Sequence, residues 1–274
     1  MFRGVTFVTG DAAGRNAANK ACVSLGDDGY ETTVKTPGKA FEGIRPDWLY
    51  LADDERTARG LADAGARTCG FLHENNRQEH FTGFKYLFDE IPEVDADSYR
   101  KAWERLSGLP WTIAKTQRLL IRETTIADLD ALYEIYSEPS VTEFQDGLLE
   151  DRDAEKRYME DYIKNIYGLM GFGIWSLVRL EDGILIGRAG LSAAKGYDNT
   201  ELGFTVGVPW QRQGYAFEAC SQILLFAGWV LGLTRVYANV KEGNTASVRL
   251  CEKLGFERDP GPGREGHIRF VKRL

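Results

Sequence analysis

The chain has 274 residues, a formal net charge of -7, a hydrophobic fraction of 43% and a charged fraction of 27%. This length suits one large or two ordinary globular domains, and the negative charge disfavours binding of nucleic acid through a basic surface. No apolar run reaches the roughly 18 residues of a membrane helix, and the short apolar start before Asp11 is not typical of a signal peptide, so we expect no membrane partner.

The metal-ligating residue types are sparse and scattered. The chain has four cysteines and three histidines, at Cys22, Cys69, Cys220, Cys251, His73, His80 and His267. Cys69 and His73 are four residues apart, but no second pair completes a zinc set. We therefore expect no metal, and free thiols in a cytoplasmic protein.

Residues 1–106 alternate between strand-like and helix-like runs. The strand-like runs are 5–10, 48–53, 67–73 and 85–91; the helix-like runs are 54–65 and 95–108; residues 27–46 read as a loop or hairpin. This alternation predicts a small α/β domain with a parallel sheet. The segment holds no recognisable catalytic set, so we expect a docking, dimerising or substrate-covering role.

The turn at 107–111 marks the boundary, with a linker over 107–117 and a second domain over 118–274. Strands are predicted at 118–123, 172–180, 184–192, 201–208 and 234–240, and helices at 129–136, 154–168, 216–231 and 245–255. Thr125 and Asp128 form a capping-box pattern, and Asp182-Gly183 predicts a hairpin turn. Helices come early, an antiparallel meander follows, and strand and helix then alternate, which indicates a mixed α/β fold.

The stretch 208–220, VPWQRQGYAFEAC, joins a strand to an apolar helix. Pro209 ends the strand because it cannot donate a ladder hydrogen bond. Gly214 lets the backbone approach a ligand closely, and Ala216 is small at the helix start. The free N–H groups at the start of a helix attract anions, so this stretch predicts a diphosphate-binding site. The alternative is a strand–helix turn with an incidental glycine.

The preceding strand presents two different faces. Leu202 and Phe204 alternate toward the core, whereas Glu201, Gly203 and Thr205 point to a nearly bare face. An extended ligand therefore has room along this strand.

Four ordered motifs resemble one enzyme family. QRQGYA at 211–216 is similar to a pyrophosphate loop of the GNAT superfamily of acyl-CoA N-acyltransferases, and NTASVRLCEKLGF at 244–256 is similar to its Asn-x-x-Ser helix. The runs 201–219 and 118–136 resemble the Rim-type ribosomal-protein alanine acetyltransferase branch. The resemblance spans residues 116–274.

The resemblance implies the GNAT fold, a mixed sheet whose centre splits at the strand 201–208, and acetyl-CoA as co-substrate in that split. The residues that it implies for the co-substrate are Val206, Val208, Gln211, Arg212, Gln213, Gly214, Tyr215, Ala216, Asn244 and Ser247.

The implied reaction is direct acetyl transfer to a primary amine in a ternary complex. An alkyl amine is protonated at neutral pH, so a general base is needed. Glu201 is the first candidate base and Glu143 the second. Many family members have a tyrosine acid where this chain has Cys251, so the proton donor stays open between Ser247, Cys251, Tyr215 and water.

The acceptor pocket is expected between the loop 137–150 and the turn 193–200. Glu143, Phe144 and Trp175 are candidate substrate-binding residues, and Tyr197 could add a further ring. The extra domain and the lack of a basic surface favour a small-molecule amine. Acetylation of a protein or peptide N-terminus and a non-catalytic acyl-CoA-binding sensor module are the alternatives, and the sequence leaves a homodimer open.

Overall fold

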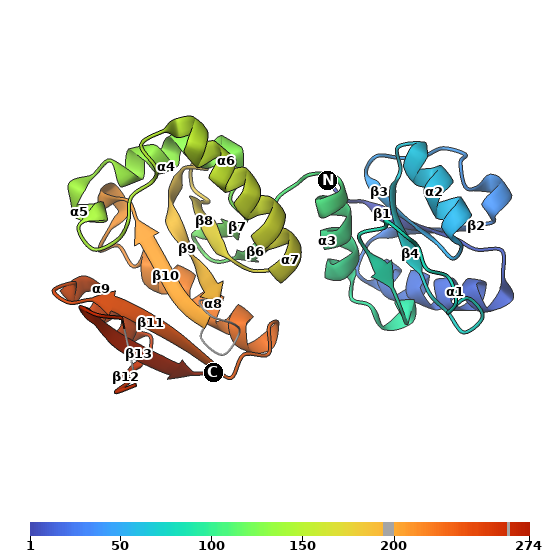
Figure 1. Cartoon of the computed structure of the whole chain (residues 1–274). Helices are drawn as coiled ribbons and strands as arrows, with labels where there is room; N and C mark the ends of the chain where they lie inside the picture. Colours follow the sequence, from blue (N-terminus) through green and yellow to red (C-terminus); the bar gives the residue numbers. More distant parts are fainter. Residues whose placement is uncertain (194–199, 262–263) are drawn as a thin grey trace. The chain divides into compact units, whose positions relative to one another are not determined.

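The computed structural model divides into two compact units, Met1–Trp111 and Thr112–Leu274, each described below by itself (Figure 1). It describes residues 1–193, 200–261 and 264–274.

The first unit is built on a five-stranded parallel sheet of order β2-β1-β3-β4-β5. Its strands are β1 (Gly4–Val8), β2 (Glu31–Lys35), β3 (Trp48–Ala52), β4 (Arg67–Phe71) and β5 (Leu87–Phe88). Its helices are α1 (Ala12–Asp27), α2 (Glu55–Asp63) and α3 (Ala96–Leu106). The parallel sheet confirms the sequence prediction for this part of the chain.

Both faces of this sheet are buried, because neighbouring residues of its strands enter different cores. Phe7 and Leu51 pack in one core together with residues of α1 and α3. Val8 and Tyr50 pack in a second core together with residues of α2. The unit is therefore a three-layer α/β/α arrangement, which explains the continuous apolar runs of β1 and β3.

Two elements of this unit were missed in the sequence. Helix α1 buries Gly14, Ala18, Ala21 and Leu25 at helical spacing, but small residues give only a weak hydrophobic pattern. The predicted loop or hairpin over 27–46 contains β2, which pairs in parallel with β1.

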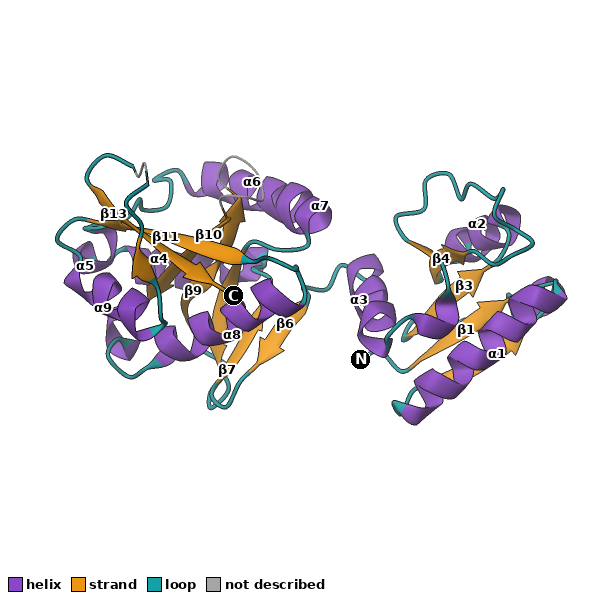
Figure 2. Ribbon diagram, turned by 90° about the horizontal axis from the view of Figure 1, so that it is seen from below, coloured by secondary structure: helices purple, strands orange, loops and turns teal. Residues whose placement is uncertain are grey.

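The second unit holds an eight-stranded mixed sheet of order β12-β13-β11-β10-β9-β8-β7-β6 (Figures 1 and 2). Its strands are β6 (Thr112–Lys115), β7 (Leu119–Arg122), β8 (Ile174–Arg179), β9 (Leu185–Ala193), β10 (Thr200–Val206), β11 (Arg235–Lys241), β12 (Glu257–Arg258) and β13 (His267–Arg273). Its helices are α4 (Leu129–Tyr136), α5 (Pro139–Thr142), α6 (Arg152–Tyr162), α7 (Gly168–Met170), α8 (Tyr215–Trp229) and α9 (Thr245–Lys253). Strand β6 falls inside the segment 107–117 that we expected to be a linker.

The sheet splits between β10 and β11. Seven residue pairs join β10 to β9, whereas one parallel pair, Glu201 with Tyr237, joins β10 to β11. The two strands therefore separate beyond Glu201 toward Val206, which confirms the predicted split sheet.

Helices cover the two faces of this sheet unequally. Ala219, Cys220 and Ile223 of α8 pack with the residues of β7 to β11 that point to one face. Leu132 of α4 and Met159 of α6 belong to a separate core, which also contains Leu185. No helix among the described residues is long and apolar enough to cross a membrane.

Candidate active site

A groove of about 650 Å³ follows the split of the sheet. Residues of β10, β11, the start of α8 and α9 line it. Nine residues predicted from the sequence lie along it: Phe144, Val206, Gln211, Arg212, Gly214, Tyr215, Ala216, Asn244 and Ser247. An extended ligand could thus lie between the separated strands and reach the start of α8.

The start of α8 has the geometry of an anion site. Gly214, the N-cap residue, has φ 86°, and Arg212 has φ 60°. Both values lie in the left-handed region, which glycine adopts without strain. Since Gly214 has no side chain to accept from the first N–H groups of the helix, these groups are available to a phosphate.

An arginine from a distant part of the chain supports this loop. Arg118 donates from Nη1 to the carbonyl oxygen of Gln213 at 3.0 Å, and its guanidinium lies 4.3 Å from the ring centroid of Tyr215. Glu218 of α8 holds it, accepting from Nε of Arg118 at 2.7 Å and from the Thr116 hydroxyl at 2.6 Å. This contact could not be predicted from the sequence, because 100 positions separate Arg118 from Glu218.

The opposite wall of the groove begins at α9. The Asn244 side chain caps this helix by accepting from the N–H of Ser247 at 3.0 Å. Lys241, Arg249 and Lys253 also line the groove. Sequence reasoning overlooked these three basic residues, although their spacing around the Asn-x-x-Ser motif could have identified them as partners for phosphate charge.

The strand end is already hydrogen-bonded. The carbonyl oxygen of Val206 accepts from Nε2 of Gln211 at 2.9 Å, and that of Val208 accepts from the N–H of Gln211 at 3.2 Å. Val208 and Gln213 are not among the residues that line the groove. A ligand amide that pairs with the Val206 carbonyl would share this oxygen with the Gln211 side chain, because a carbonyl oxygen can accept two hydrogen bonds.

Glu201 lies at the closed end of the split, where β10 still pairs with β11. Its side chain is 17% exposed, and Oε2 lies 3.2 Å from Nη2 of Arg264, an exposed residue. Glu201 itself does not line the groove.

Two predicted residues lie in the core. Cys251 is fully buried, and burial raises the pKa of its thiol to about 11. Trp175 is also fully buried and packs edge-on against Phe226 of α8, with ring centroids 5.3 Å apart. The structure brings neither side chain to the groove, so we take neither further as a site residue.

Of the two predicted substrate-binding residues that follow α5, one lies at the groove. Phe144 lines the groove, and a Cβ at Gly243 would meet its ring at 3.6 Å. The backbone carbonyl of Glu143 accepts from Nζ of Lys241 at 3.0 Å. Glu143 does not line the groove. Tyr197 lies outside the described residues.

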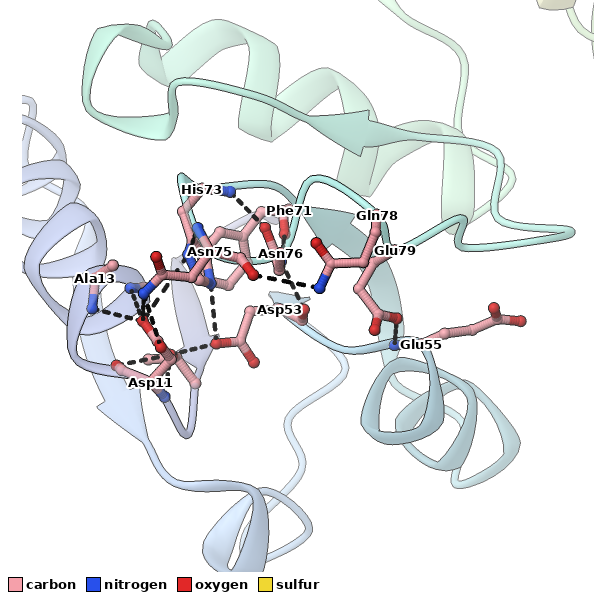
Figure 3. Close-up of polar contacts among 12 residues, drawn as sticks. Asp11, Ala13, Asp53, Glu55, Phe71, His73, Asn75, Asn76, Gln78 and Glu79 are labelled. Carbon is pink, nitrogen blue, oxygen red and sulfur yellow. Dashed lines mark hydrogen bonds and ion pairs between the residues drawn. The ribbon is translucent and has the colours of Figure 1, made fainter.

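The first unit contains a polar cluster at the carboxyl ends of β1, β3 and β4 (Figure 3). The hydroxyl of Thr9 donates to Asp53, and Nε2 of His73 lies 3.4 Å from Oδ2 of Asp53. Asp11 caps α1 and accepts from the Asn75 amide at 3.1 Å. Burial is the main cause that raises the pKa of Asp53.

This cluster is closed by α1. A Cβ atom at Gly14 would lie 2.9 Å from Oδ2 of Asp53 and 3.0 Å from Nε2 of His73. The helix therefore packs directly on these groups at Gly14. We interpret the cluster as an internal network that joins three loops.

No group of three or more potential metal ligands is found in the part of the chain that the structure describes. The four cysteines are free.

Comparison with known proteins agrees with this geometry. A family model described as an acetyltransferase (GNAT) domain matches residues 118–257. The uncharacterized N-acetyltransferase YoaA of Bacillus subtilis is 30% identical over 149 residues, which are 54% of this chain and 84% of that protein.

Solved structures share the fold. An acetyltransferase from Agrobacterium tumefaciens has a TM-score of 0.51 at 22% identity and covers 59% of this chain and 94% of its own. A ribosomal-protein-S5-alanine acetyltransferase from Vibrio fischeri has a TM-score of 0.51 at 13% identity and covers 60% and 96%. The chain belongs to the GNAT acetyltransferase family. It is thus an acetyltransferase, and its family uses acetyl-CoA as co-substrate.

Proposed function

We propose that the second unit transfers the acetyl group of acetyl-CoA to a primary amine of a small molecule. One observation carries the proposal: the split opens at Glu201 and widens toward the uncapped start of α8. A diphosphate at that helix start leaves the rest of an extended co-substrate to run back along β10. Its reactive end then lies near the carboxylate at the closed end.

In this proposal Glu201 acts as the general base. It removes a proton from the ammonium form of the acceptor, directly or through water. The neutral amine attacks the thioester carbonyl, and a backbone N–H of β10 stabilises the oxyanion. The C–S bond then breaks, the nitrogen loses its extra proton as the amide forms, and the leaving thiolate takes a proton from Ser247, Tyr215 or water. Because the amine attacks the thioester directly, no acyl-enzyme forms.

Two observations support the finer parts of the proposal. A second cavity of about 270 Å³ lies beside Tyr136 and Arg188, and its size suits a small amine better than an extended peptide. The free cysteines support a cytoplasmic location.

The test is CoA release from acetyl-CoA, measured by thiol detection against a panel of acceptors. The panel contains amino acids, polyamines, aryl amines, aminoglycosides and short peptides with free N-termini. We expect release that depends on one class of small amine. Release with peptides alone would replace the small-molecule acceptor by a protein N-terminus. Tight acetyl-CoA binding without acceptor-dependent release across the panel would favour a sensor module.

A further inference from the structure

The sheet face that carries Glu201 also carries an arginine. In the register of β10 with β9, Gly203 pairs with Gly190 and Thr205 pairs with Arg188. Paired residues of adjacent strands point to the same face, and every second residue of a strand returns to it. Glu201, Thr205 and Arg188 therefore share one face of the sheet.

Arg188 lines the cavity of about 270 Å³, together with Tyr136, Asp146, Glu155 and Tyr158. Its Nε is buried and has no hydrogen-bond partner among the residues that the structure describes. A buried guanidinium N–H without an acceptor costs free energy. Arg188 thus contributes to the cavity wall a guanidinium group whose Nε lacks an acceptor.

The acidic residues that line this cavity do not accept a hydrogen bond from Nε of Arg188. Glu155 is 4% exposed and accepts from the N–H of Leu149 at 3.0 Å. The arginine ion pairs in the described part of α4 to α6 and β8 join other residues, such as Arg152 with Asp130 and Arg179 with Asp182. The charge of Arg188 is accordingly available to a ligand.

The cavity adjoins the co-substrate groove through one layer of side chains. Thr205 lines the groove, and its hydroxyl oxygen lies 3.4 Å from the Tyr136 hydroxyl, which lines the cavity. The bare floor at Gly203 continues along the same face, since a Cβ there would meet only the Ile174 side chain at 3.7 Å. The Thr205 hydroxyl also donates to Oε1 of Gln145 at 2.7 Å, so an acceptor that spans the cavity and the groove would have to displace this pair of hydroxyl side chains.

We propose that this cavity is the subsite for a carboxylate of the acceptor, and that Arg188 binds it. The acceptor class is then an α-amino acid, whose amine points to the groove. A guanidinium pairs with a carboxylate through two parallel hydrogen bonds. The carboxylates of Glu155 and Asp146 in the same wall disfavour a doubly charged phosphate more than a singly charged carboxylate. This inference rests on the proposed acetylation of a small amine.

The test compares three matched acceptors: an α-amino acid, its carboxamide and its decarboxylated amine, for aliphatic, aromatic and polar side chains. For the wild type we expect kcat/KM for the acid to exceed that for the amide at least tenfold. Arg188→Met should remove this preference and leave the KM for acetyl-CoA unchanged. Arg188→Lys should restore part of it, because the charge is kept.

Arg152→Met, which removes an exposed arginine on α6, is the matched control and should keep the full preference. An equal loss for acid and amide in Arg188→Met would show a merely structural role and overturn the proposal. Equal rates for acid and amide in the wild type would do the same.

If no acceptor is acetylated while acetyl-CoA still binds, the proposed function fails. The carboxylate subsite is then judged separately, by calorimetric titration of the enzyme–CoA complex with the same acids and amides. Acids that bind no more tightly than amides, or equally well to Arg188→Met, would overturn it.

Discussion

Arg118 and Glu218 form an ion pair behind the co-substrate loop, with Nη2 of Arg118 2.7 Å from Oε2 of Glu218. Burial alone would raise the pKa of the Glu218 carboxyl. Hydrogen bonds from Thr116 and Arg118 outweigh burial and hold this pKa below its usual range. The charged pair positions the arginine so that it can hold the Gln213 carbonyl. The loop that we propose for the diphosphate is thus held by the turn between β6 and β7 of the same unit.

Arg118→Met should weaken acetyl-CoA binding, because the loop loses its hydrogen bond and a nearby positive charge. We expect the KM for acetyl-CoA to rise about tenfold with a smaller change in kcat, in line with one charged hydrogen bond. Steady-state kinetics at saturating acceptor measure this. Arg152→Met is the control and should leave the KM unchanged; an unchanged KM in Arg118→Met would remove the arginine from the binding machinery.

Gly214→Ala should cost both stability and affinity. Its φ of 86° lies in the left-handed region, where a Cβ costs about 1–2 kcal/mol. Gly183→Ala is a matched control, because Gly183 has φ 74° in the hairpin between β8 and β9. Both variants should lower Tm, but only Gly214→Ala should weaken acetyl-CoA binding, by about tenfold on calorimetry. Equal affinities in the two variants would contradict a role for this backbone in binding.

Glu201→Gln should lower kcat by about 100-fold, the usual contribution of a general base. The amide keeps the size of the carboxylate but cannot accept the proton. Acetyl-CoA affinity should stay within about twofold, since Glu201 does not line the groove. Glu143→Gln, directly after α5, is the matched variant. A larger loss of kcat in Glu143→Gln than in Glu201→Gln would transfer the role of base.

Much of the second unit could be predicted because its local patterns are strong. Thr125 and Asp128 form the expected capping box, and the split begins at the expected strand. The capping box depends on residues close in sequence, whereas the split was implied by the resemblance to the GNAT family. The placement of Trp175 could not be predicted, because a strand residue points to either face and only the packed α8 shows which face is core.

Contacts between residues that are distant in the chain could not be predicted from the sequence, for a different reason. Arg118 meets Glu218, and Arg188 faces the loop before α6, only once the sheet has formed. No local periodicity records such pairings. In the first unit the small residues of α1 hid the helix, because alanine and glycine give weak amphipathic contrast.

The stability of the second unit should fall on acidification partly through Asp128. Burial alone would raise the pKa of the Asp128 carboxyl. Hydrogen bonds from Arg122, the N–H of Thr125 and the Ser176 hydroxyl outweigh burial and lower this pKa. The folded state therefore binds its proton less readily than the unfolded state, whose aspartate pKa is about 3.9. This contribution is complete above about pH 5 and is lost as the pH falls through the lowered folded pKa.

Asp128→Asn tests this dependence. We expect a loss of about 3 kcal/mol at pH 7, because the half-buried Arg122 loses its charged partner. The decrease in unfolding free energy between pH 5 and pH 3 should become shallower than in the wild type. Asp130→Asn, at an exposed position of α4, should change neither quantity. If the unfolding free energy of Asp128→Asn fell between pH 5 and pH 3 as steeply as that of the wild type, the Asp128 carboxyl would not be the source of this pH dependence.

Two glycines of α1 allow a test of the polar cluster in the first unit. A Cβ at Gly14 would lie 2.9 Å from Oδ2 of Asp53, whereas a Cβ at Gly26 meets nothing within 4 Å. Gly14→Ala should therefore overpack the helix against Asp53 and His73 and destabilise the first unit by about 2–3 kcal/mol. Gly26→Ala should stabilise it by about 0.5–1 kcal/mol, because alanine favours the helix over the unfolded chain. Urea unfolding followed by hydrogen exchange in residues 1–111 measures both. Equal unfolding free energies of the two variants would mean that α1 does not pack tightly against this cluster. A decrease for Gly14→Ala and an increase for Gly26→Ala would show that the packing of α1 on the cluster depends on Gly14.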